Sequence, residues 1–403
     1  MSTSIYHNIV ATAGISLFAA HNEYGKLARN EGFFRFERSN PLPLADETEE
    51  ATRLRWSNFC SRADLQATRT HPQAISAEFS LLHALSRLKR LGDSPHVSLI
   101  ITQTLGGWAA AELLKRLLRN AFSAEVQIKT IGDLDVNEPA NLRRSLGQFM
   151  QTVAQELEGK DASFTCFAPV GGYKVMTSLG YLAGAYMGFP TAYLHEDNQV
   201  LHEVPAVPIQ IDHVALSRLA PLVRQTRGEI MKWSALPIPD QEAISRHPYL
   251  FERADDLIAL NAFGIFITGR PEYARLFGTQ VHGTEAIETE FRGGAGNFLC
   301  GQVRELIKKL NDPTGNWGEL RHELSFESLN GKDLAFHLYK GASNGVLPFR
   351  AAYQYERATD VLFLSRIWTN HAAYEREASQ GKGLRATDQS ASWRDLTSLI
   401  WEV

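Results

Sequence analysis

Three short glycine-containing segments have the composition of phosphate-binding turns. The candidate ligand-binding residues are Thr12, Ala13, Gly14 and Ser16 in the first, Thr104, Leu105, Gly106 and Gly107 in the second, and Gly171, Gly172, Tyr173 and Lys174 in the third. Glycine allows close approach of a ligand to the backbone, and backbone N–H groups with nearby hydroxyls can hold a phosphate. Lys174 would add a positive charge at a helix N-terminus, which already favours anions. We therefore expect a phosphate-rich ligand.

Each of these segments follows a run of residues that predicts a strand. Strands are expected at 9–12, 97–102, 126–131, 164–167 and 191–194, and helices at 48–66, 73–91, 108–119, 141–157 and from Gly172 to residue 187, with a loop at 22–46. Alternating strands and helices predict an α/β, Rossmann-like domain with a parallel sheet covered on both faces. Ligands of such sheets bind at the carboxyl ends of the strands, where all three turns are expected.

Each turn, taken singly, has a second interpretation. Its glycines could serve strand–helix packing, with Lys174 on a solvated face. The spacing also excludes common nucleotide sites, because no G-x-G-x-x-G follows the first strand and no G-x-x-x-x-G-K-[ST] is present. Hydride transfer and nucleoside triphosphate hydrolysis are therefore poor interpretations.

Basic and aromatic side chains are interleaved between residues 331 and 377. The cations are Lys332, Lys340, Arg350, Arg357, Arg366 and Arg376, and the aromatics are Phe336, Tyr339, Phe349, Tyr353, Tyr355, Trp368 and Tyr374. Cations neutralise phosphates and aromatics stack on exposed bases, so this composition suits single-stranded RNA. In the alternative, the aromatics form a small core and the cations are solvated. A helix at 295–310 and strands at 334–340, 347–355 and 361–368 predict an antiparallel α+β domain, with Arg350 directed away from the core, near Lys340.

The segment between these two regions predicts a third unit. Helices are expected at 213–232 and 240–261 and a strand at 262–267, which is typical of either a winged helix-turn-helix or a helical linker. The predicted domains are therefore 1–208, 209–280 and 281–403. A chain of 403 residues is long enough for two or three domains.

Bulk composition indicates a soluble cytoplasmic protein. The formal net charge of -4 argues against a surface built for bulk nucleic-acid binding, although a local basic cleft is compatible with it. Cys60, Cys166 and Cys300 offer neither a disulfide framework nor a Cys-x-x-Cys metal pair, so each is expected to be buried and apolar. No signal segment is recognisable, and the most apolar stretch, 164–189, is interrupted by a proline, a lysine and five glycines. We expect no membrane association.

The first 205 residues resemble the CRISPR-associated Rossmann-fold (CARF) sensors. These have a Thr-x-Gly-x-Ser-type turn, matched here by Thr12, Gly14 and Ser16, and a later Gly-Gly-aromatic-Lys turn, matched by Gly171, Gly172 and Lys174. The resemblance implies a homodimer that binds one cyclic oligoadenylate, tetra-adenylate in preference to hexa-adenylate, across its two-fold axis. A symmetric ring of phosphates suits an isologous interface.

Residues 285–380 resemble the RelE family of ribosome-dependent mRNA interferases. The likeness consists of a helix ending in Lys308-Lys309-Leu310, followed by strands that carry Lys340 and Arg350 and a late arginine near a tyrosine, here Arg366 and Tyr374. His371 is not part of that pattern. Together the two halves resemble CARF–RelE fusions, and the resemblance implies an activator-gated ribonuclease that acts on mRNA on the bacterial ribosome.

In this chemistry the RNA supplies its own nucleophile. Its 2′-hydroxyl attacks the adjacent phosphorus, so the protein positions the chain, moves protons and neutralises charge, without a metal or cofactor. The candidate catalytic residues are Arg350 and Arg366 for phosphate stabilisation, Lys340 for backbone binding or proton uptake, and Tyr374 or His371 for acid–base catalysis or base stacking.

Three alternatives remain at this stage. Arg366 and His371 also fit the Arg-x(4-6)-His motif of HEPN ribonucleases, which requires both residues on a helix. The chain could instead be a ligand-responsive transcription regulator that uses the segment at 213–276, or a ring nuclease that degrades its own activator.

Overall fold

The computed structural model divides into two compact units. It describes residues 5–19, 21–31, 33, 50–131, 139–194, 200–226, 230–311, 318, 320–343, 347–388 and 392–401. The first unit contains residues 1–211 and 261–266, and the second contains 212–260 and 267–403. Because the second unit combines most of the segment at 209–280 with the C-terminal region, the predicted three-domain division stays a prediction.

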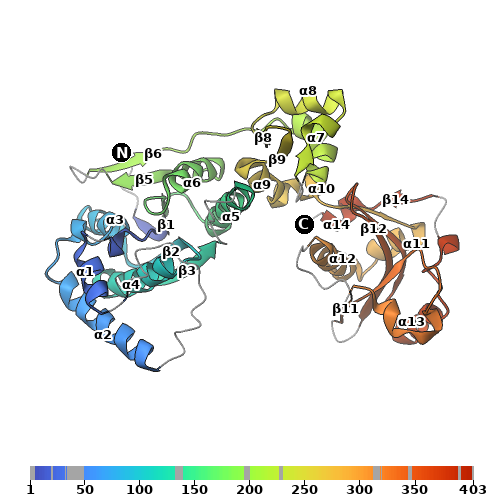
Figure 1. The fold of residues 1–403 in the computed structure, drawn as a ribbon, viewed down its shortest axis with the longest axis horizontal. Helices are drawn as coiled ribbons and strands as arrows, with labels where there is room; N and C mark the ends of the chain where they lie inside the picture. The colour runs from blue at the N-terminus through green and yellow to red at the C-terminus, as the bar shows by residue number, and fades with distance from the viewer. Residues whose placement is uncertain are drawn as a thin grey trace. The chain divides into compact units, whose positions relative to one another are not determined.

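The first unit is built on a six-stranded sheet (Figure 1). Its strands are β1 (Tyr6–Thr12), β2 (Leu91–Thr102), β3 (Glu125–Ile131), β4 (Thr165–Ala168), β5 (Thr191–Leu194) and β6 (Leu201–Val204), in the order β3-β2-β1-β4-β5-β6. The first five strands run parallel and β6 is antiparallel to β5. The predicted α/β class with a parallel sheet is thus found.

Helices cover both faces of this sheet, as Figure 1 shows. They are α1 (Glu23–Asn30), α2 (Glu50–Ala67), α3 (Ala77–Arg87), α4 (Leu105–Phe122), α5 (Pro139–Leu157) and α6 (Lys174–Tyr186). Successive strand residues point to opposite faces. Ile9, Leu99 and Ile101 accordingly pack with α1 to α4, whereas Phe167 lies under Gly184 of α6.

Two expectations for this unit are wrong. Residues 23–30 form α1, although a loop was predicted at 22–46. Asn22 caps this helix by accepting a hydrogen bond from Tyr24 N at 2.9 Å. Residues 34–46 of that segment lie outside the described residues. Strand β2 begins at Leu91, six residues before the predicted start, because it pairs with β1 from Tyr6 onward through an irregular register.

The second unit begins with α7 (His213–Gln225) and continues with two short helices and a small sheet. Its further elements are β7 (Met231–Lys232), the 3-10 turn η5 (Trp233–Ala235), α8 (Ile238–Arg246), β8 (Phe251–Ala254), β9 (Leu257–Leu260) and α9 (Ala262–Thr268), with strand order β7-β9-β8. Helix α9 spans the boundary between the two units.

The predicted helices at 213–232 and 240–261 are therefore wrong in extent, and the predicted strand at 262–267 is a helix. Helix α8 ends before Pro248, because the residue preceding a proline avoids helical backbone, and His247 has φ -128° and ψ 55°. Asp255, with φ 53°, then forms the turn of the β8–β9 hairpin. Asn261 starts a helix instead of a strand, since its side chain accepts a hydrogen bond from Gly264 N at 2.8 Å.

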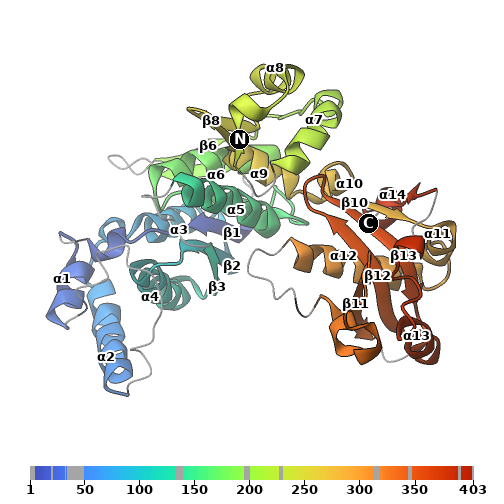
Figure 2. The same ribbon diagram turned by 45° about the vertical axis from the view of Figure 1, so that its right-hand side comes forward.

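The C-terminal region contains a five-stranded sheet in the order β11-β12-β13-β10-β14. The strands are β10 (Gln280–Gly283), β11 (His337–Ser343), β12 (Pro348–Glu356), β13 (Val361–Trp368) and β14 (Arg394–Asp395); the helices are α10 (Ala274–Phe277), α11 (Glu285–Phe291), α12 (Gly296–Leu310), α13 (His371–Ala378) and α14 (Thr397–Trp401). Strands β11, β12 and β13 are antiparallel, as predicted, but β10 runs parallel to β13, so the sheet is mixed. Figure 2 shows β11, β12 and β13 side by side.

Two hydrophobic clusters cover the two faces of this sheet. Tyr339, Phe349 and Tyr353 lie with α12 in the larger cluster, whereas Trp368 and Tyr374 lie with Leu338 and Ala352 in a smaller cluster that includes part of α13. Many of the interleaved aromatics are thus core residues, as the alternative interpretation held. Arg350 is not solvated either, since only 7% of it is exposed.

The three cysteines are free and buried, as expected. Among the described residues, helices that are both long enough and apolar enough to span a bilayer are absent.

Packing of α6 on the sheet gives a test of the first unit. A Cβ atom at Gly184 would lie 2.6 Å from the ring of Phe167, so Gly184→Val should overpack this contact and lower the free energy of unfolding by about 1–3 kcal/mol. Ser178→Val, on the exposed side of the same helix, should change it by less than about 0.5 kcal/mol. Urea unfolding of both variants measures the difference, and equal stabilities would contradict this packing.

Candidate functional sites

The first and third glycine turns are tied together at the carboxyl edge of the sheet. They follow β1 and β4, which are neighbouring parallel strands. The Thr12 hydroxyl donates to Gly171 O at 2.7 Å, and Gly171 N lies 3.1 Å from both the carbonyl and the hydroxyl oxygen of Thr12. A Cβ atom at Gly14 would lie 2.7 Å from Gly172 N. The two turns therefore form one structure, and Gly14 is needed for their close approach.

The outer part of this structure is accessible. Gly172 has φ +92°, a conformation that L side chains rarely adopt, and it leads into the N-terminus of α6. Among the residues that the structure describes, no side-chain hydrogen bond caps that helix end. Ser16, Tyr173 and Lys174 are exposed around it, whereas Thr12 and Ala13 are buried beneath. An anion could thus reach both the backbone of the turns and the Lys174 ammonium.

The second turn has a structural role at the start of helix α4. The Thr104 hydroxyl caps α4 by accepting a hydrogen bond from Gly107 N at 3.0 Å, and Thr104, Gly106 and Gly107 are buried. A Cβ atom at Gly107 would lie 2.8 Å from Thr102 O. These residues form the junction between β2 and α4, with Leu105 partly exposed; their contact with a ligand stays a prediction.

A buried carboxyl group lies beneath the joined turns. Glu78, in the first turn of α3, is only 1% exposed, and its Oε1 accepts a hydrogen bond from Gly14 N at 3.0 Å. The same oxygen would lie 2.2 Å from a Cβ atom at Gly171. Its Oε2 is buried without a hydrogen-bond partner among the described residues. Burial raises the pKa of Glu78, against the opposing hydrogen bonds from its own backbone, Ser76 and Gly14.

Glu78 was missed in the sequence, because one glutamate at the start of a helix has no distinguishing pattern. Its role depends on the tertiary contact of Glu78 with Gly14 and Gly171, in the turns that follow β1 and β4.

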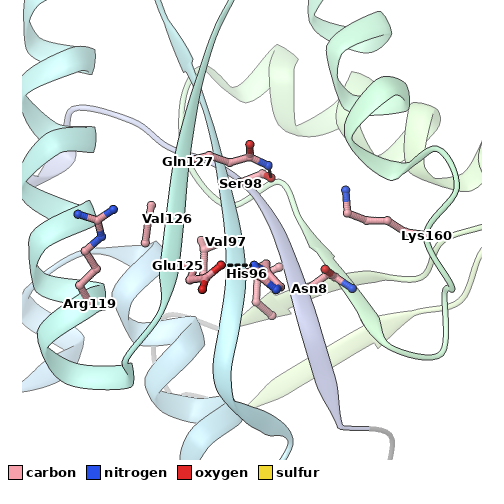
Figure 3. Close-up of a pocket in the computed structure, with 10 residues that line it drawn as sticks. Asn8, His96, Val97, Ser98, Arg119, Glu125, Val126, Gln127 and Lys160 are labelled. Atoms are coloured by element: carbon pink, nitrogen blue, oxygen red, sulfur yellow. Dashed lines mark hydrogen bonds and ion pairs between the residues drawn. The ribbon is translucent and has the colours of Figure 1, made fainter.

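A hollow in the first unit lies at the opposite edge of the sheet (Figure 3). It has a volume of about 480 Å³ and surrounds the amino ends of β1, β2 and β3, where His96 and Glu125 form an ion pair at 2.9 Å. Because ligands of open parallel sheets bind at the carboxyl edge, we do not assign the phosphate ligand to this hollow.

In the C-terminal sheet, two cations are direct cross-strand neighbours. Lys340 on β11 pairs with Arg350 on β12, and Arg350 pairs in turn with Trp368 on β13. Directly paired residues have their side chains on the same face, and like charges in this position are destabilising. Neither cation forms an ion pair with a carboxylate in the described part of the chain. Such an arrangement is typical of a site that receives an anion.

Arg350 is held in place by backbone oxygens and an aromatic ring. Its Nη1 donates to Phe349 O at 2.7 Å and to Gly341 O at 3.3 Å, and its guanidinium carbon lies 5.3 Å from the centre of the Tyr374 ring. Its Nε is buried and unpartnered among the described residues. A buried guanidinium without a counterion is costly, so a stabilising role alone does not explain it.

Tyr374 is a core residue, not an exposed acid or base. It is 1% exposed, and burial raises its pKa to about 12, although the Arg350 charge acts in the opposite direction. It lies on helix α13, which the sequence did not predict; Asn370 caps this helix by accepting a hydrogen bond from Ala373 N at 2.9 Å. The His371 ring stacks on Tyr374 with centroids 6.0 Å apart and is itself exposed.

Arg366 is placed differently from the other candidates. It forms an ion pair with Glu377 at 2.6 Å and lies over the Trp368 ring, and Glu377 also accepts a hydrogen bond from Trp368 Nε1. The structure therefore brings Lys340, Arg350, Tyr374 and His371 together, whereas Arg366 is neutralised by a carboxylate. The HEPN alternative is not supported, since Arg366 is on a strand and His371 begins a helix.

Within the described ranges, groups of three or more His, Cys, Asp or Glu residues that could hold a metal ion were not found.

Residues 73–207 match a family described as "CRISPR-associated protein (Cas_APE2256)". The match covers about a third of the chain, including Glu78 and the Gly171–Lys174 turn, and it supports a CRISPR-associated protein. No curated protein matches the chain.

The pKa of Glu78 predicts how its charge affects stability. A carboxyl whose pKa is raised on folding stabilises the fold fully only below its unfolded pKa, about 4.3, and this contribution is lost as pH rises through the folded pKa. Glu78→Gln keeps an oxygen for Gly14 N but cannot ionise. Relative to wild type, this variant should therefore gain stability in urea unfolding as the pH rises above about 4.3, until the pH passes the folded pKa of Glu78.

Glu112→Gln on the partly exposed side of α4 is the matched control and should show no such trend. A difference between wild type and Glu78→Gln that stays constant or reverses with rising pH would show that Glu78 is not a buried neutral acid.

Proposed function

We propose that this chain is a cytoplasmic endoribonuclease of type III CRISPR antiviral defence, activated by a cyclic oligoadenylate. It would cleave mRNA in the ribosomal A-site and so arrest translation. The observation that carries the proposal is the pair Lys340 and Arg350, two neighbouring cations without a described counterion, one of them buried. A phosphate of the RNA backbone is the anion that would occupy this position.

The sensor part of the proposal rests on the joined glycine turns. Backbone N–H groups at the α6 N-terminus and the exposed Lys174 would bind one or two phosphates of the activator. In a homodimer, two such sites related by a two-fold axis would hold a ring of four adenylates. The match of residues 73–207 to a CRISPR-associated family supports this assignment, because that range contains the third turn.

The catalytic part assigns the cations to the transition state. The 2′-hydroxyl oxygen attacks phosphorus, the bond to the 5′-oxygen breaks, and negative charge builds on the non-bridging oxygens. Arg350, whose orientation is fixed by Phe349 O and Gly341 O, would stabilise that charge, and exposed Lys340 would bind the backbone. Arg366 would act through its ion pair with Glu377 as a positioning residue over the Trp368 ring.

A DNA-binding regulator is the weaker alternative. Helix α8 would be the recognition helix of a winged helix, yet its exposed Arg246 is paired with Glu242 at 3.1 Å. A net positive face, which phosphate contacts require, is therefore missing from this helix.

Substitutions should separate activator binding from cleavage. Lys174→Ala should weaken binding of cyclic tetra-adenylate, measured by calorimetry, by about tenfold or more, as expected for one lost charge-assisted contact. Arg350→Ala should leave that affinity unchanged and reduce mRNA cleavage, with or without ribosomes, by about 10²–10³-fold.

Lys160→Ala, beside the hollow at the other edge of the sheet, and Arg292→Ala, paired with Glu288 on the surface, are the respective controls. Full cleavage by Arg350→Ala would refute the site. Failure of the wild-type protein to cleave with either cyclic tetra- or hexa-adenylate would refute the activity. Linear products of the ring after incubation would instead reveal a ring nuclease.

A further inference from the structure

His322 lies beside the cation pair although its position in the chain is remote from the other candidates. It is the first residue of the 3-10 turn η7 (His322–Ser325), which precedes β11 by more than ten residues. Glu323 fixes this turn to β11, because it accepts a hydrogen bond from Leu338 N at 2.9 Å and forms an ion pair with His337. The turn is therefore held against the strand that carries Lys340.

The imidazole ring of His322 stacks on Tyr374. Their centroids are 6.3 Å apart and their planes are inclined by 22°, while Phe326 contacts the imidazole edge-on. Tyr374 in turn lies beneath the Arg350 guanidinium. Tyr374 thus contacts both His322 and Arg350, and this places an imidazole and a guanidinium around one aromatic ring.

The surroundings of His322 favour its neutral form. Partial burial lowers its pKa most, and the charges of Lys340 on β11 and Arg350 on β12 lower it further. Glu375 on α13 and Glu323 on η7 act in the opposite direction but are outweighed. A neutral imidazole near two cations is suited to accept a proton at neutral pH.

We infer that His322 is the general base of the proposed ribonuclease, taking the proton from the attacking 2′-hydroxyl. Its Nδ1 lies 3.5 Å from the Ser325 hydroxyl, which leaves Nε2 for this transfer. The inference rests on the proposed ribonuclease function. His322 thus replaces Tyr374 and His371 as the candidate for proton transfer. Tyr374 is buried and its pKa is raised, and His371, which also stacks on Tyr374, is exposed to solvent.

The step balances without any further reactant. The 2′-oxygen forms a bond to phosphorus as its proton passes to His322 Nε2, and the bond from phosphorus to the 5′-oxygen breaks. The 5′-oxygen takes a proton from water, and the imidazolium returns its proton to solvent. The products are a 2′,3′-cyclic phosphate and a 5′-hydroxyl end.

Cleavage of a defined mRNA by full-length protein with cyclic tetra-adenylate, with and without ribosomes, tests this role. His322→Ala should lower kcat by about 10²–10⁴-fold with a smaller change in KM, and free imidazole should restore part of the activity. Wild-type kcat/KM should rise with pH through a pKa below the usual histidine range and then level off, and this rise should disappear in His322→Ala. His247→Ala, at the end of α8, should leave cleavage unchanged.

The possible outcomes are distinct. If wild type cleaves and His322→Ala retains its rate within about threefold, or if His371→Ala alone is inactive, His322 is not the base although the proposed function stands. If His322→Ala is inactive because it is misfolded, imidazole will not rescue it; the wild-type pH profile then decides, and a rate independent of pH through this range contradicts the inference. If wild type does not cleave with either activator, the proposed function itself fails.

Discussion

The C-terminal half depends on the placement of two cations side by side, Lys340 and Arg350, neither of which forms an ion pair with a described carboxylate. Cross-strand pairing fixes their separation, so the repulsion between them cannot be relieved by a change of register without moving the whole sheet. Arg350 is further fixed by two backbone carbonyls and by Tyr374. The core beneath α13 thus shields the Arg350 charge from water. A charge interacts most strongly with a phosphate when water is excluded.

The site proposed for a phosphate in the N-terminal half uses the backbone in place of a buried cation. The positive end of the helix dipole of α6 lies at its N-terminus, where Thr12 joins the two glycine turns. Glu78 accepts a hydrogen bond from Gly14 N and so supports the joined turns from below. An ionised carboxyl would repel the phosphates expected above it, and burial raises the pKa of Glu78, which disfavours that ionised form. In the proposed function both halves would therefore bind anions, an exposed site taking the regulatory ligand and a partly buried site taking the reacting group.

Local sequence patterns predicted the elements that depend on periodicity and turn chemistry. The parallel strands, the glycine turns and β13 follow from alternating apolar runs and from glycine positions, so they could be located before the structure. Residues whose role depends on tertiary contacts could not: Glu78 and His322 lie in segments without a motif. Helix α13 was missed because its start is set by one capping asparagine, and the ion pair of Arg366 could not be predicted because Glu377 lies eleven residues away on that helix.

The most direct test of the account is the salt dependence of RNA binding. With cyclic tetra-adenylate in excess, wild type, Lys340→Met and Arg350→Met would be titrated with an RNA that carries a 2′-deoxynucleotide at the cleavage position. If both cations contact backbone phosphates, the slope of log K against log[salt] should fall by about 0.7 for each substitution. Slopes identical to that of wild type would show that the cation pair does not receive the RNA backbone.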